Sequence, residues 1–371
     1  MLKRLTLWLL VAAIAIAAAI AGGLAAERYL RERALDNAFA RLMLFHELRR
    51  AALEDYLKSM ASDVRAASEN PRVVEATENL TFAFQTLGPE VRQILPRLYI
   101  AGNPYPDGEK DKLERADDNS YYSSYHGDFH GWAKRFRAHF GYYDVFLISP
   151  RGDILYTVAK ENDFATNLKT GPYRKSPLAA AFRRAMADPA RVAFSDFARY
   201  PPSDDAPAAF AAHAVVKDGK PIGVFAIQIP AEPLNELMHF TAGMGESGET
   251  YLVGPDGFMR SQSRFTAKPT LLEVKVDNHS VEDGQSGMAG KYIVKDYRGV
   301  PVLSVFAPVD FGGQPFVLLA EIDEAEVLAQ SRGWIVFAAA ALSALAAALL
   351  TLLLYALIFG RRPEPAPSAA L

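Results

Sequence analysis

Side chains suited to holding a small ligand gather in one stretch of the 371-residue chain, between positions 156 and 210. Aromatic rings supply the apolar walls of a small-molecule pocket, and a few placed polar groups orient the ligand. Lys160 can hold a ligand carboxylate as a point charge. Asp196, which stands between Phe194 and Phe197, can pair with a ligand cation or polar group. The candidate ligand-binding residues of this stretch are Tyr156, Lys160, Tyr173, Asp196, Tyr200 and Phe210.

Each candidate also has an ordinary structural explanation. Asp196 can act as a turn or capping carboxylate. Lys160 can be a solvated loop lysine, because lysines are rarely buried. The tyrosines can be core residues whose hydroxyl groups are hydrogen-bonded. The sequence leaves these alternatives open.

Metal binding and catalysis find no comparable support. His126 and His130 are four residues apart, as two ligands on one helix face would be, but Gly127 and Gly131 weaken a helix at this place. The chain contains no cysteine, which removes disulfides, thiolate metal sites and cysteine nucleophiles. It has no Gly-X-Ser-X-Gly, P-loop or HEXXH pattern. We therefore predict no metal site, no cofactor, no catalytic residue and no enzyme.

The overall charge argues against one class of partner. The formal net charge is −3 at pH 7, whereas nucleic-acid binding normally needs a strongly basic surface. The length corresponds to two or three domains of about 100–200 residues each.

The amino-terminal part of the chain has helical periodicity. Apolar residues recur every three or four positions from about residue 28 to residue 70, with one interruption at Arg49. The residue before a proline avoids the helical region, so Asn70-Pro71 is predicted to end this helix. More helix follows to about residue 100. The segment 102–119, rich in Gly, Pro and Asp, is predicted to be a surface loop.

Beyond residue 141 the pattern is that of strands and turns. Alternating and β-branched runs are separated by turns such as Pro150-Arg151-Gly152-Asp153. Two short amphipathic helices are predicted at 178–186 and 233–240. The predicted strands of this part are 142–148, 154–158, 191–197, 208–216 and 222–229.

The strand pattern then recurs. Phe146–Gly152 matches Tyr251–Gly257 at an offset of 105 residues, and Gly219–Phe225 is echoed by Gly299–Val305. A last strand at 316–322 leads into a helix that begins at Glu324. Two such units, preceded in the sequence by one long helix, predict a duplicated α+β architecture. Its predicted parts are a stalk helix with following helices (27–100), a first sheet lobe (101–238) and a second sheet lobe (239–333).

Two uncharged segments lie outside the lobes. Residues 5–26 and 334–360 each exceed the roughly 20 apolar residues that a membrane helix needs. Basic residues stand at their outer ends, which by the positive-inside rule places both termini in the cytoplasm. We therefore predict a double-pass protein of the bacterial inner membrane, with the bilayer as a partner, residues 1–4 and 361–371 cytoplasmic, and residues 27–333 periplasmic.

The first of these segments has a second interpretation, a cleaved signal peptide. Its apolar core is longer than the 7–15 residues typical of such peptides, which favours an uncleaved anchor. Whether it is cleaved stays open.

Four stretches resemble the double Cache family of bacterial extracytoplasmic sensors. The family has a long amino-terminal helix and two PAS-like antiparallel-sheet lobes, and its usual hosts are chemotaxis receptors, histidine kinases and nucleotide cyclases. The resemblance implies a ligand pocket in the membrane-distal lobe. We also expect a homodimer through the long first helix. The matching stretches are Tyr142–Ile148 with its turn, Asp163–Leu168, Phe194–Phe197 and Gly245–Val253.

The chain departs from the amino-acid-binding relatives at two places. In those relatives an Arg-X-Trp-Tyr run clamps the ligand carboxylate, and a strand aspartate pairs with its amine. Thr170-Gly171-Pro172-Tyr173 stands at the first position here and Gln228 at the second. Gln228 thereby joins the candidate residues through the resemblance, and recognition of an amino acid stays open.

The function predicted from these features is a membrane-anchored sensor of a small molecule. Only residues 361–371 follow the second apolar segment, so we expect no output domain and expect signalling or docking through the membrane helices to a separate partner or larger membrane complex. The alternatives are a structural or accessory subunit of a membrane assembly, with no working pocket, and a receptor that has lost its output.

Overall fold

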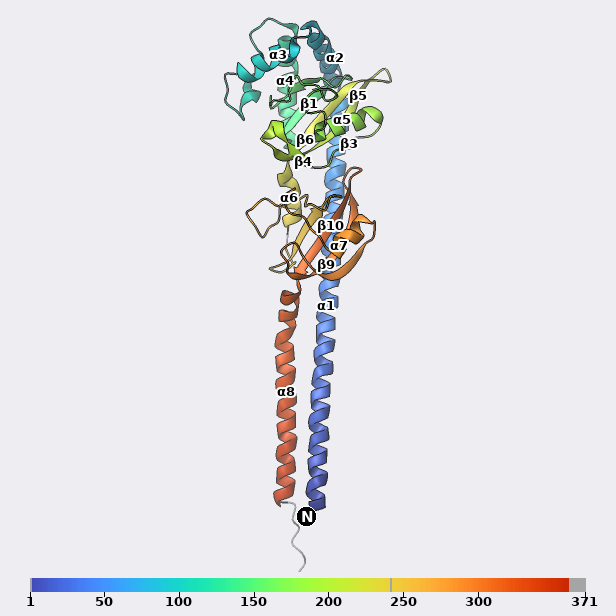
Figure 1. Cartoon of the computed structure of the whole chain (residues 1–371), viewed down its shortest axis with the longest axis vertical. Coiled ribbons are helices and arrows are strands. Elements are labelled where there is room, and N and C mark those ends of the chain that lie inside the picture. The colour runs from blue at the N-terminus through green and yellow to red at the C-terminus, as the bar shows by residue number, and fades with distance from the viewer. Residues whose placement is uncertain (1, 241, 360–371) are drawn as a thin grey trace, which may run out of the picture.

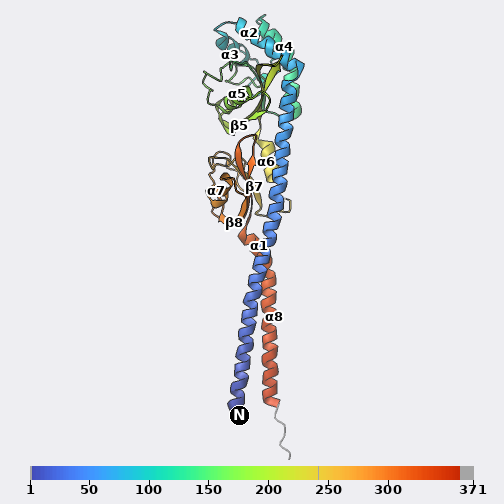
Figure 2. The ribbon, with the colours of Figure 1, turned by 90° about the vertical axis from the view of Figure 1, so that its right-hand side faces the viewer.

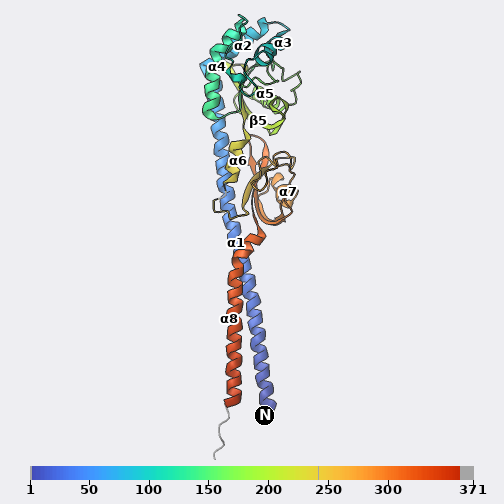
Figure 3. The same cartoon turned by 90° about the vertical axis from the view of Figure 1, so that its left-hand side faces the viewer.

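The molecule is long and narrow, with two sheet lobes attached to one side of a single helix. The computed structural model describes residues 2–240 and 242–359. Helix α1 (Leu2–Ser68) runs beside both lobes and continues past them, and helix α8 (Glu324–Phe359) accompanies its lower part (Figures 1, 2 and 3). We call the lobe farther from the amino-terminal end of α1 the distal lobe and the other the proximal lobe.

The elements follow one another in the order helices, sheet, linker helix, sheet. The helices before and within the distal lobe are α2 (Pro71–Thr86), α3 (Val91–Pro96), the π-helical turn η1 (Arg97–Ala101), the 3₁₀ turn η2 (Lys110–Lys112), α4 (Tyr121–Phe140), α5 (Pro177–Ala187) and the 3₁₀ turn η3 (Pro201–Ser203). Its strands are β1 (Asp144–Ile148), β2 (Ile154–Thr157), β3 (Ala193–Phe194), β4 (Ala198–Tyr200), β5 (Ala206–Lys217) and β6 (Lys220–Ile229). The proximal lobe follows with α6 (Ala231–His239), β7 (Glu249–Val253), α7 (His279–Gln285), β8 (Gly290–Lys295), β9 (Pro301–Asp310) and β10 (Pro315–Asp323).

The distal sheet is antiparallel, in the order β2-β1-β6-β5-β3, with β4 paired to β5. Successive side chains of a strand point to opposite faces, so each strand serves two cores. The outer face carries Val145, Leu147 and Phe225 and is covered by α1, α2 and α4. The inner face carries Phe146 and Phe210 and is covered by α5.

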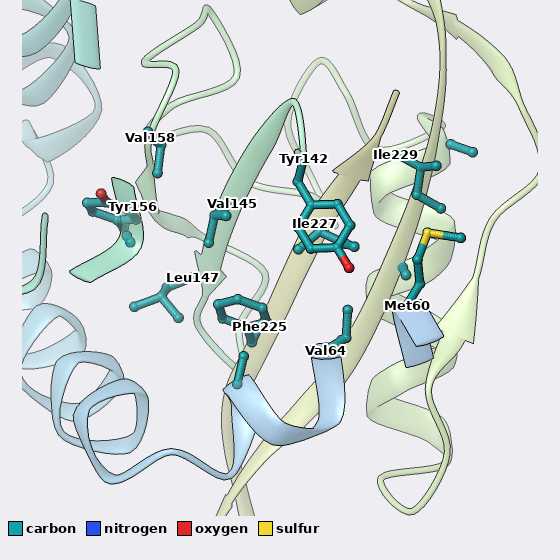
Figure 4. Packing of buried hydrophobic residues seen from close by; sticks show 14 of the residues in the cluster. Met60, Val64, Tyr142, Val145, Leu147, Tyr156, Val158, Phe225, Ile227 and Ile229 are labelled. Carbon is teal, nitrogen blue, oxygen red and sulfur yellow. The ribbon is translucent and has the colours of Figure 1, made fainter. Parts of the chain in front are cut away.

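Helix α1 supplies a continuous apolar stripe to the outer face. Leu53, Leu57, Met60 and Val64 are buried at the three- and four-residue spacing of one helix face. Figure 4 shows Met60 and Val64 among the buried side chains of the sheet. The predicted end of the helix is confirmed, because Asn70 lies after α1 and its side chain accepts a hydrogen bond from the first turn of α2.

The interruption of the stripe at Arg49 has a structural role. Arg49 is buried, donates a hydrogen bond to the carbonyl oxygen of Phe240 and lies over the ring of the same residue at 4.9 Å. His46, one turn earlier, hydrogen-bonds to the Leu318 carbonyl oxygen at 3.0 Å. These polar residues tie α1 to the backbone after α6, at Phe240, and to strand β10, at Leu318.

Helix α4 forms around His126 although Gly127 and Gly131 were expected to weaken a helix there. Ser120 caps its first turn by accepting from the Ser123 amide at 3.1 Å, and Gly141 ends it in the left-handed conformation. Tyr122, His126 and Phe129 are buried on one face. Tertiary packing of this aromatic face outweighs the roughly 1 kcal/mol that each interior glycine costs.

The two lobes share one strand order, which corrects half of the predicted repeat. The proximal sheet runs β7-β10-β9-β8. Strand β1 pairs with the last strand of its lobe, β6, and β7 pairs with the last strand of its lobe, β10. The match of Phe146–Gly152 with Tyr251–Gly257 therefore links equivalent strands. The echo between Gly219–Phe225 and Gly299–Val305 does not, since one turn joins β5 to β6 and the other joins β8 to β9.

The predicted α+β class, with a long amino-terminal helix and antiparallel sheets, is confirmed. The membrane topology is wrong. Over residues 2–240 and 242–359, no helix combines the length and the apolar character needed to cross a bilayer. The prediction rested on the uncharged runs 5–26 and 334–360, and the described helices do not bear these out as membrane spans.

The predicted localisation depended on those spans and is wrong for the same reason. It was a double-pass protein of the inner membrane with residues 27–333 in the periplasm. Met1 and the predicted tail, residues 361–371, lie outside the described residues, as does Gly360 at the end of the second segment.

The lobes meet through aromatic rings. Phe311, in the turn between β9 and β10, is fully buried, and its ring centroid lies 6.2 Å from that of Phe194 and 5.9 Å from that of Phe197. The neighbouring Gly312 has a φ of +58° and packs against the Phe194 ring. The turn of one lobe is thus fitted to the loop between β3 and β4 of the other.

This fit predicts different effects for two adjacent glycines. Gly312 and Gly313 both have positive φ, but a methyl group at Gly312 would overlap the Phe194 ring, whereas one at Gly313 meets nothing within 4 Å. We expect Gly312→Ala to lower the free energy of unfolding by about 1–3 kcal/mol more than Gly313→Ala, the usual cost of overpacking. Urea denaturation of both variants measures the difference, and equal losses would contradict the interlobe contact.

Candidate functional site

Four of the seven candidate residues meet on the inner face of the distal sheet. Phe210 of β5 lies directly across from Gln228 of β6. The ring of Tyr200 lies 5.0 Å from that of Phe210 and 6.4 Å from that of Tyr173. Tyr200 and Phe210 are fully buried, Gln228 is almost so, and Tyr173 packs at the margin. The structure therefore builds an aromatic wall with one amide in it.

Asp144, at the start of β1, adds a carboxylate to the same face. It stands across from Gln228 and is fully buried. Its Oδ1 accepts from the amides of Val158 and Ala159, each at 2.9 Å, and its Oδ2 accepts from the Thr157 hydroxyl. Burial raises the pKa of Asp144 to about 7, and these hydrogen bonds offset part of the rise. Asp144 thus fixes the loop that leaves β2.

Asp163, in that loop, is the least compensated acid of the site. It is fully buried, and its Oδ2 accepts from the Tyr200 hydroxyl at 2.5 Å. Its Oδ1 has no hydrogen-bond partner. Burial raises the pKa of Asp163 to about 8, with the nearby charges of Asp144 and Glu161 adding to the rise. A buried acceptor without a donor costs about 1–3 kcal/mol, so this atom is suited to an external donor.

A chain of hydrogen bonds links the amide of Gln228 to the surface. Gln228 Nε2 donates to Ser203 Oγ at 3.1 Å, and Ser203 donates to Glu161 Oε2 at 2.6 Å. Glu161 Oε1 accepts from the Tyr143 hydroxyl at 2.7 Å. The Gln228 Oε1 atom, like Asp163 Oδ1, is buried without a partner. Two unpartnered acceptors therefore lie on the same side of this sheet.

An open cleft of about 900 Å³ lies at the outer end of this hydrogen-bond chain. Glu161 and Tyr143 belong both to the chain and to the wall of the cleft. The charged residues of the wall are of both signs, and four of them form two ion pairs, Arg137 with Asp111 at 3.0 Å and Lys110 with Asp107 at 2.6 Å. The charged lining residues are Asp107, Lys110, Asp111, Arg137, Lys160, Glu161 and Asp204.

The backbone around the cleft is strained. Lys160, Ala165, Asp204 and Asp205 all have φ between +53° and +61°, a region that costs a non-glycine residue about 1–2 kcal/mol. Such strain persists only where the surroundings enforce it, and it clusters at ligand sites.

Tyr156 and Lys160 lie on the other side of the sheet, away from the aromatic wall. The Tyr156 hydroxyl hydrogen-bonds to His130 Nδ1 at 2.5 Å, and Lys160 Nζ lies 3.4 Å from His130 Nε2. Burial lowers the pKa of Lys160 to about 7 and that of His130 to about 3. Lys160 is therefore a buried lysine rather than a solvated one, and it reaches the cleft only at its wall.

His126 and His130 are internal residues of α4. Their rings stack at 4.8 Å, His126 Nδ1 hydrogen-bonds to the Glu114 carbonyl oxygen, and His130 Nε2 hydrogen-bonds to the Asp111 carbonyl oxygen. Over the described part of the chain, no group of three or more His, Cys, Asp or Glu residues is arranged to hold a metal ion.

Asp196 lies outside the site, in the contact between lobes. Both of its carboxylate oxygens accept from Arg260 of the proximal lobe, at 2.8 and 2.9 Å. Arg260 is 2% exposed and also pairs with Asp256 at 2.9 Å. The structure assigns Asp196 to an interlobe ion pair.

The acids of the site were not among the predicted residues. Asp144 and Asp163 lie inside two of the stretches that resemble the double Cache family, but neither was predicted to be a site residue. A signal was available for Asp144, because it directly precedes the apolar run Val145–Ile148. An aspartate at the start of a buried strand has to be buried with hydrogen-bond partners. Glu161 and Ser203 gave no local signal, because their positions depend on the tertiary fold.

Sequence comparisons find nothing: no protein-family model matches the chain, and no curated protein does. Comparison of structures does find similar folds. The ligand-binding domain of the Campylobacter jejuni chemoreceptor Tlp3, in complex with 4-methylisoleucine, is 15% identical over 80% of this chain and 94% of that domain, with a TM-score of 0.46.

Two more similar structures are also sensor domains. The ligand-binding domain of the Pseudomonas fluorescens chemoreceptor CtaA, in complex with L-leucine, is 14% identical over 76% of this chain and 99% of that one, with a TM-score of 0.38. The extracellular domain of the putative histidine kinase mmHK1S-Z2 is 14% identical over 78% and 99%, with a TM-score of 0.42. The structures similar to this chain thus include domains of the kind that the four stretches resemble.

Proposed function

We propose that this chain is a ligand-sensing domain whose distal lobe binds a small polar solute rich in hydrogen-bond donors. The observation that carries the proposal is the pair of buried, unpartnered acceptors, Asp163 Oδ1 and Gln228 Oε1, behind a cleft of about 900 Å³. A donor group of the ligand would satisfy both atoms. No catalytic role is part of the proposal.

The charges of the site favour a ligand with a cationic or donor end and an anionic or neutral end. Acids lie on the sheet side, where Asp144 and Asp163 are buried. The outer wall also carries bases, Lys110 and Arg137, each paired with an aspartate of the same wall. Matched potentials of this kind orient a ligand that carries both signs.

Amino acids satisfy this pattern, and the similar chemoreceptor domains are described in complex with 4-methylisoleucine and L-leucine. Because this chain has Thr170–Tyr173 and Gln228 where amino-acid-binding relatives have the arginine, tryptophan and aspartate, the proposal extends to amines and polyols. The homodimer and the separate signalling partner stay predictions.

A ligand screen tests the proposal. A solute that binds the folded chain alone raises its stability by about 2.7 kcal/mol at 100 times Kd. We expect at least one amino acid, amine or polyol to raise the melting temperature of the full chain with increasing concentration. We expect Gln228→Met, which keeps the volume and removes the amide, to abolish the rise, and Gln93→Met, at an exposed position of α3, to keep it.

A structural role without a working pocket is the second candidate function. One observation favours it: the acids of the site already accept hydrogen bonds from this chain. Asp163 accepts from the Tyr200 hydroxyl, Glu161 from Ser203 and Asp144 from Thr157. A flat screen across all three ligand classes would support this role and contradict the sensor.

A further inference from the structure

A groove lies between helices α2 and α4, at the end of the molecule farthest from the amino terminus (Figures 1 and 2). Its volume is about 280 Å³, and its lining residues come from these two helices. Ala76 and Phe129, both nearly buried, form its apolar floor. No lining residue of the groove belongs to the cleft of the proposed sensor site, so the two places are separate.

The two helices bring matched faces to the groove. Asn79 and Phe82 are three positions apart on α2, and Tyr121, Tyr125 and Asp128 follow one another on α4 at steps of four and three. Residues at this spacing lie on the same face of a helix. The Phe82 ring lies 6.4 Å from that of Tyr121, whereas Asn79, Tyr125 and Asp128 line the groove. The late residues of α2 therefore face the first turn of α4.

Three aromatic rings extend the groove along the surface. The Tyr121 ring lies between the other two, 6.4 Å from Phe82 and 6.5 Å from Tyr125, and it is stacked on Tyr125 with 20° between the planes. Tyr121 is 66% exposed and Phe82 is 55% exposed. Neighbouring apolar groups that stay exposed beside polar residues mark interaction sites. We call Phe82, Tyr121 and Tyr125 the aromatic rail.

The polar side chains of the groove are available to a ligand. Arg72, Glu75 and Asn79 make no side-chain hydrogen bond or ion pair with any residue that the structure describes. Asp128 makes one long contact, at 3.5 Å from Arg115, and its side chain is 69% exposed. The groove therefore offers acceptors at Glu75 and Asp128, donors at Arg72, and both kinds of group at Asn79.

These groups suit a neutral ligand better than a charged one. The carboxylates of Glu75 and Asp128 repel a phosphate, and the guanidinium of Arg72 repels a cation. The faces of the rail are uncharged and slightly negative, so they attract C–H groups. A pyranose ring combines C–H groups on its faces with hydroxyl groups at its edge that both donate and accept.

From these observations we propose that the groove and the aromatic rail bind a neutral oligosaccharide. One sugar unit occupies the groove, where Tyr125 supplies a ring and Asn79 and the two carboxylates bind its hydroxyl groups. The next units stack on Tyr121 and Phe82. Pockets for drug-sized ligands measure about 300–1,000 Å³, so the groove holds one unit and the rest of the chain lies on the rail.

Saturation-transfer difference NMR of the full chain tests the proposal, with cellotriose, maltotriose and triacetylchitotriose as probes. We expect saturable transfer to the ring C–H protons of at least one trisaccharide. That trisaccharide should bind about tenfold more tightly than its monosaccharide, equal to about 1.4 kcal/mol, because only the longer chain reaches the rail. Equal affinities would contradict the role of the rail, and no saturable transfer from any of the three would overturn the proposal.

Tetramethylammonium chloride and triproline are the reference ligands, one for a cation held by aromatic rings and one for a peptide. We expect neither to displace the trisaccharide. If either bound through Tyr121 more tightly than every trisaccharide, the groove would be a cation or peptide site and the proposal would be wrong.

Three variants locate the binding. Tyr121→Ala and Asn79→Leu should each weaken it about tenfold, while Tyr292→Ala, at a 41% exposed tyrosine of the proximal lobe, should leave it unchanged. Circular dichroism and melting curves check that each variant folds. Retention of full affinity in both groove variants would overturn the proposal. Loss in Gln228→Met with retention in Tyr121→Ala would move the saccharide to the distal cleft, which overturns this proposal and supports the sensor site.

Discussion

Replacing Asp196 by alanine is expected to lower the free energy of unfolding by about 3 kcal/mol, the low end of the cost of removing one partner from a buried ion pair. Arg260 is 2% exposed and loses two hydrogen bonds in the variant. The cost stays at the low end because Asp256 remains at 2.9 Å from the guanidinium. Chemical denaturation at neutral pH gives the difference directly.

The matched comparison is Asp188→Ala. Asp188 is an exposed aspartate of the same lobe, at the end of α5, and its loss should cost less than about 0.5 kcal/mol. If Asp196 acted only as a ligand group, its replacement would change ligand binding and leave stability near that of the control. A loss of stability without a change in any ligand-induced shift is the result that the interlobe ion pair predicts.

The second large effect concerns pH and Asp163. A carboxyl whose pKa is raised to about 8 by burial holds its proton in the folded chain, whereas in the unfolded chain it titrates near 4. Folded molecules thus bind more protons than unfolded ones between these values. The stabilising contribution is complete below about pH 4 and is lost as pH rises to about 8.

Asp163→Asn removes this titration. Each uncompensated proton gives a slope of about 1.4 kcal/mol per pH unit, so the stability of the variant relative to the wild type should rise by up to about 4 kcal/mol from pH 5 to pH 8. Urea denaturation at four or five pH values measures the two slopes. Because Asp144 and Glu321 also have raised pKa values, the variant keeps part of the dependence. Parallel curves for the two proteins would show that Asp163 is ionised in the folded state.

Local patterns predicted most of the secondary structure. The strands of the distal lobe and the helix before each lobe follow from periodicity and turn residues, which are properties of neighbouring positions. The exceptions have tertiary causes. Helix α4 forms despite Gly127 and Gly131 because its aromatic face is buried against the sheet. The predicted strand 191–197 shrinks to β3, because Asp196 lies outside the sheet and pairs with Arg260.

The candidate site was predicted in part, for a related reason. Alternation along β5 and β6 puts Phe210 and Gln228 on one face, and this follows from the sequence once the strands are known. Which acids reach them does not follow. Asp163 and Glu161 come from a loop whose path depends on Asp144 accepting its amides, and that contact joins residues about 15 positions apart through the fold.

By itself, then, the amino-acid sequence determined the order of helices and strands, the duplication of the lobes and the apolar stripe of α1, because each depends on the spacing of side chains along the chain. Only the tertiary structure decided which polar groups lie together: Asp144 with Gln228, Glu249 with Glu321, and Asp196 with Arg260. Those pairs join residues 64 to 84 positions apart, and no local pattern specifies which distant strand or loop a buried charge will face.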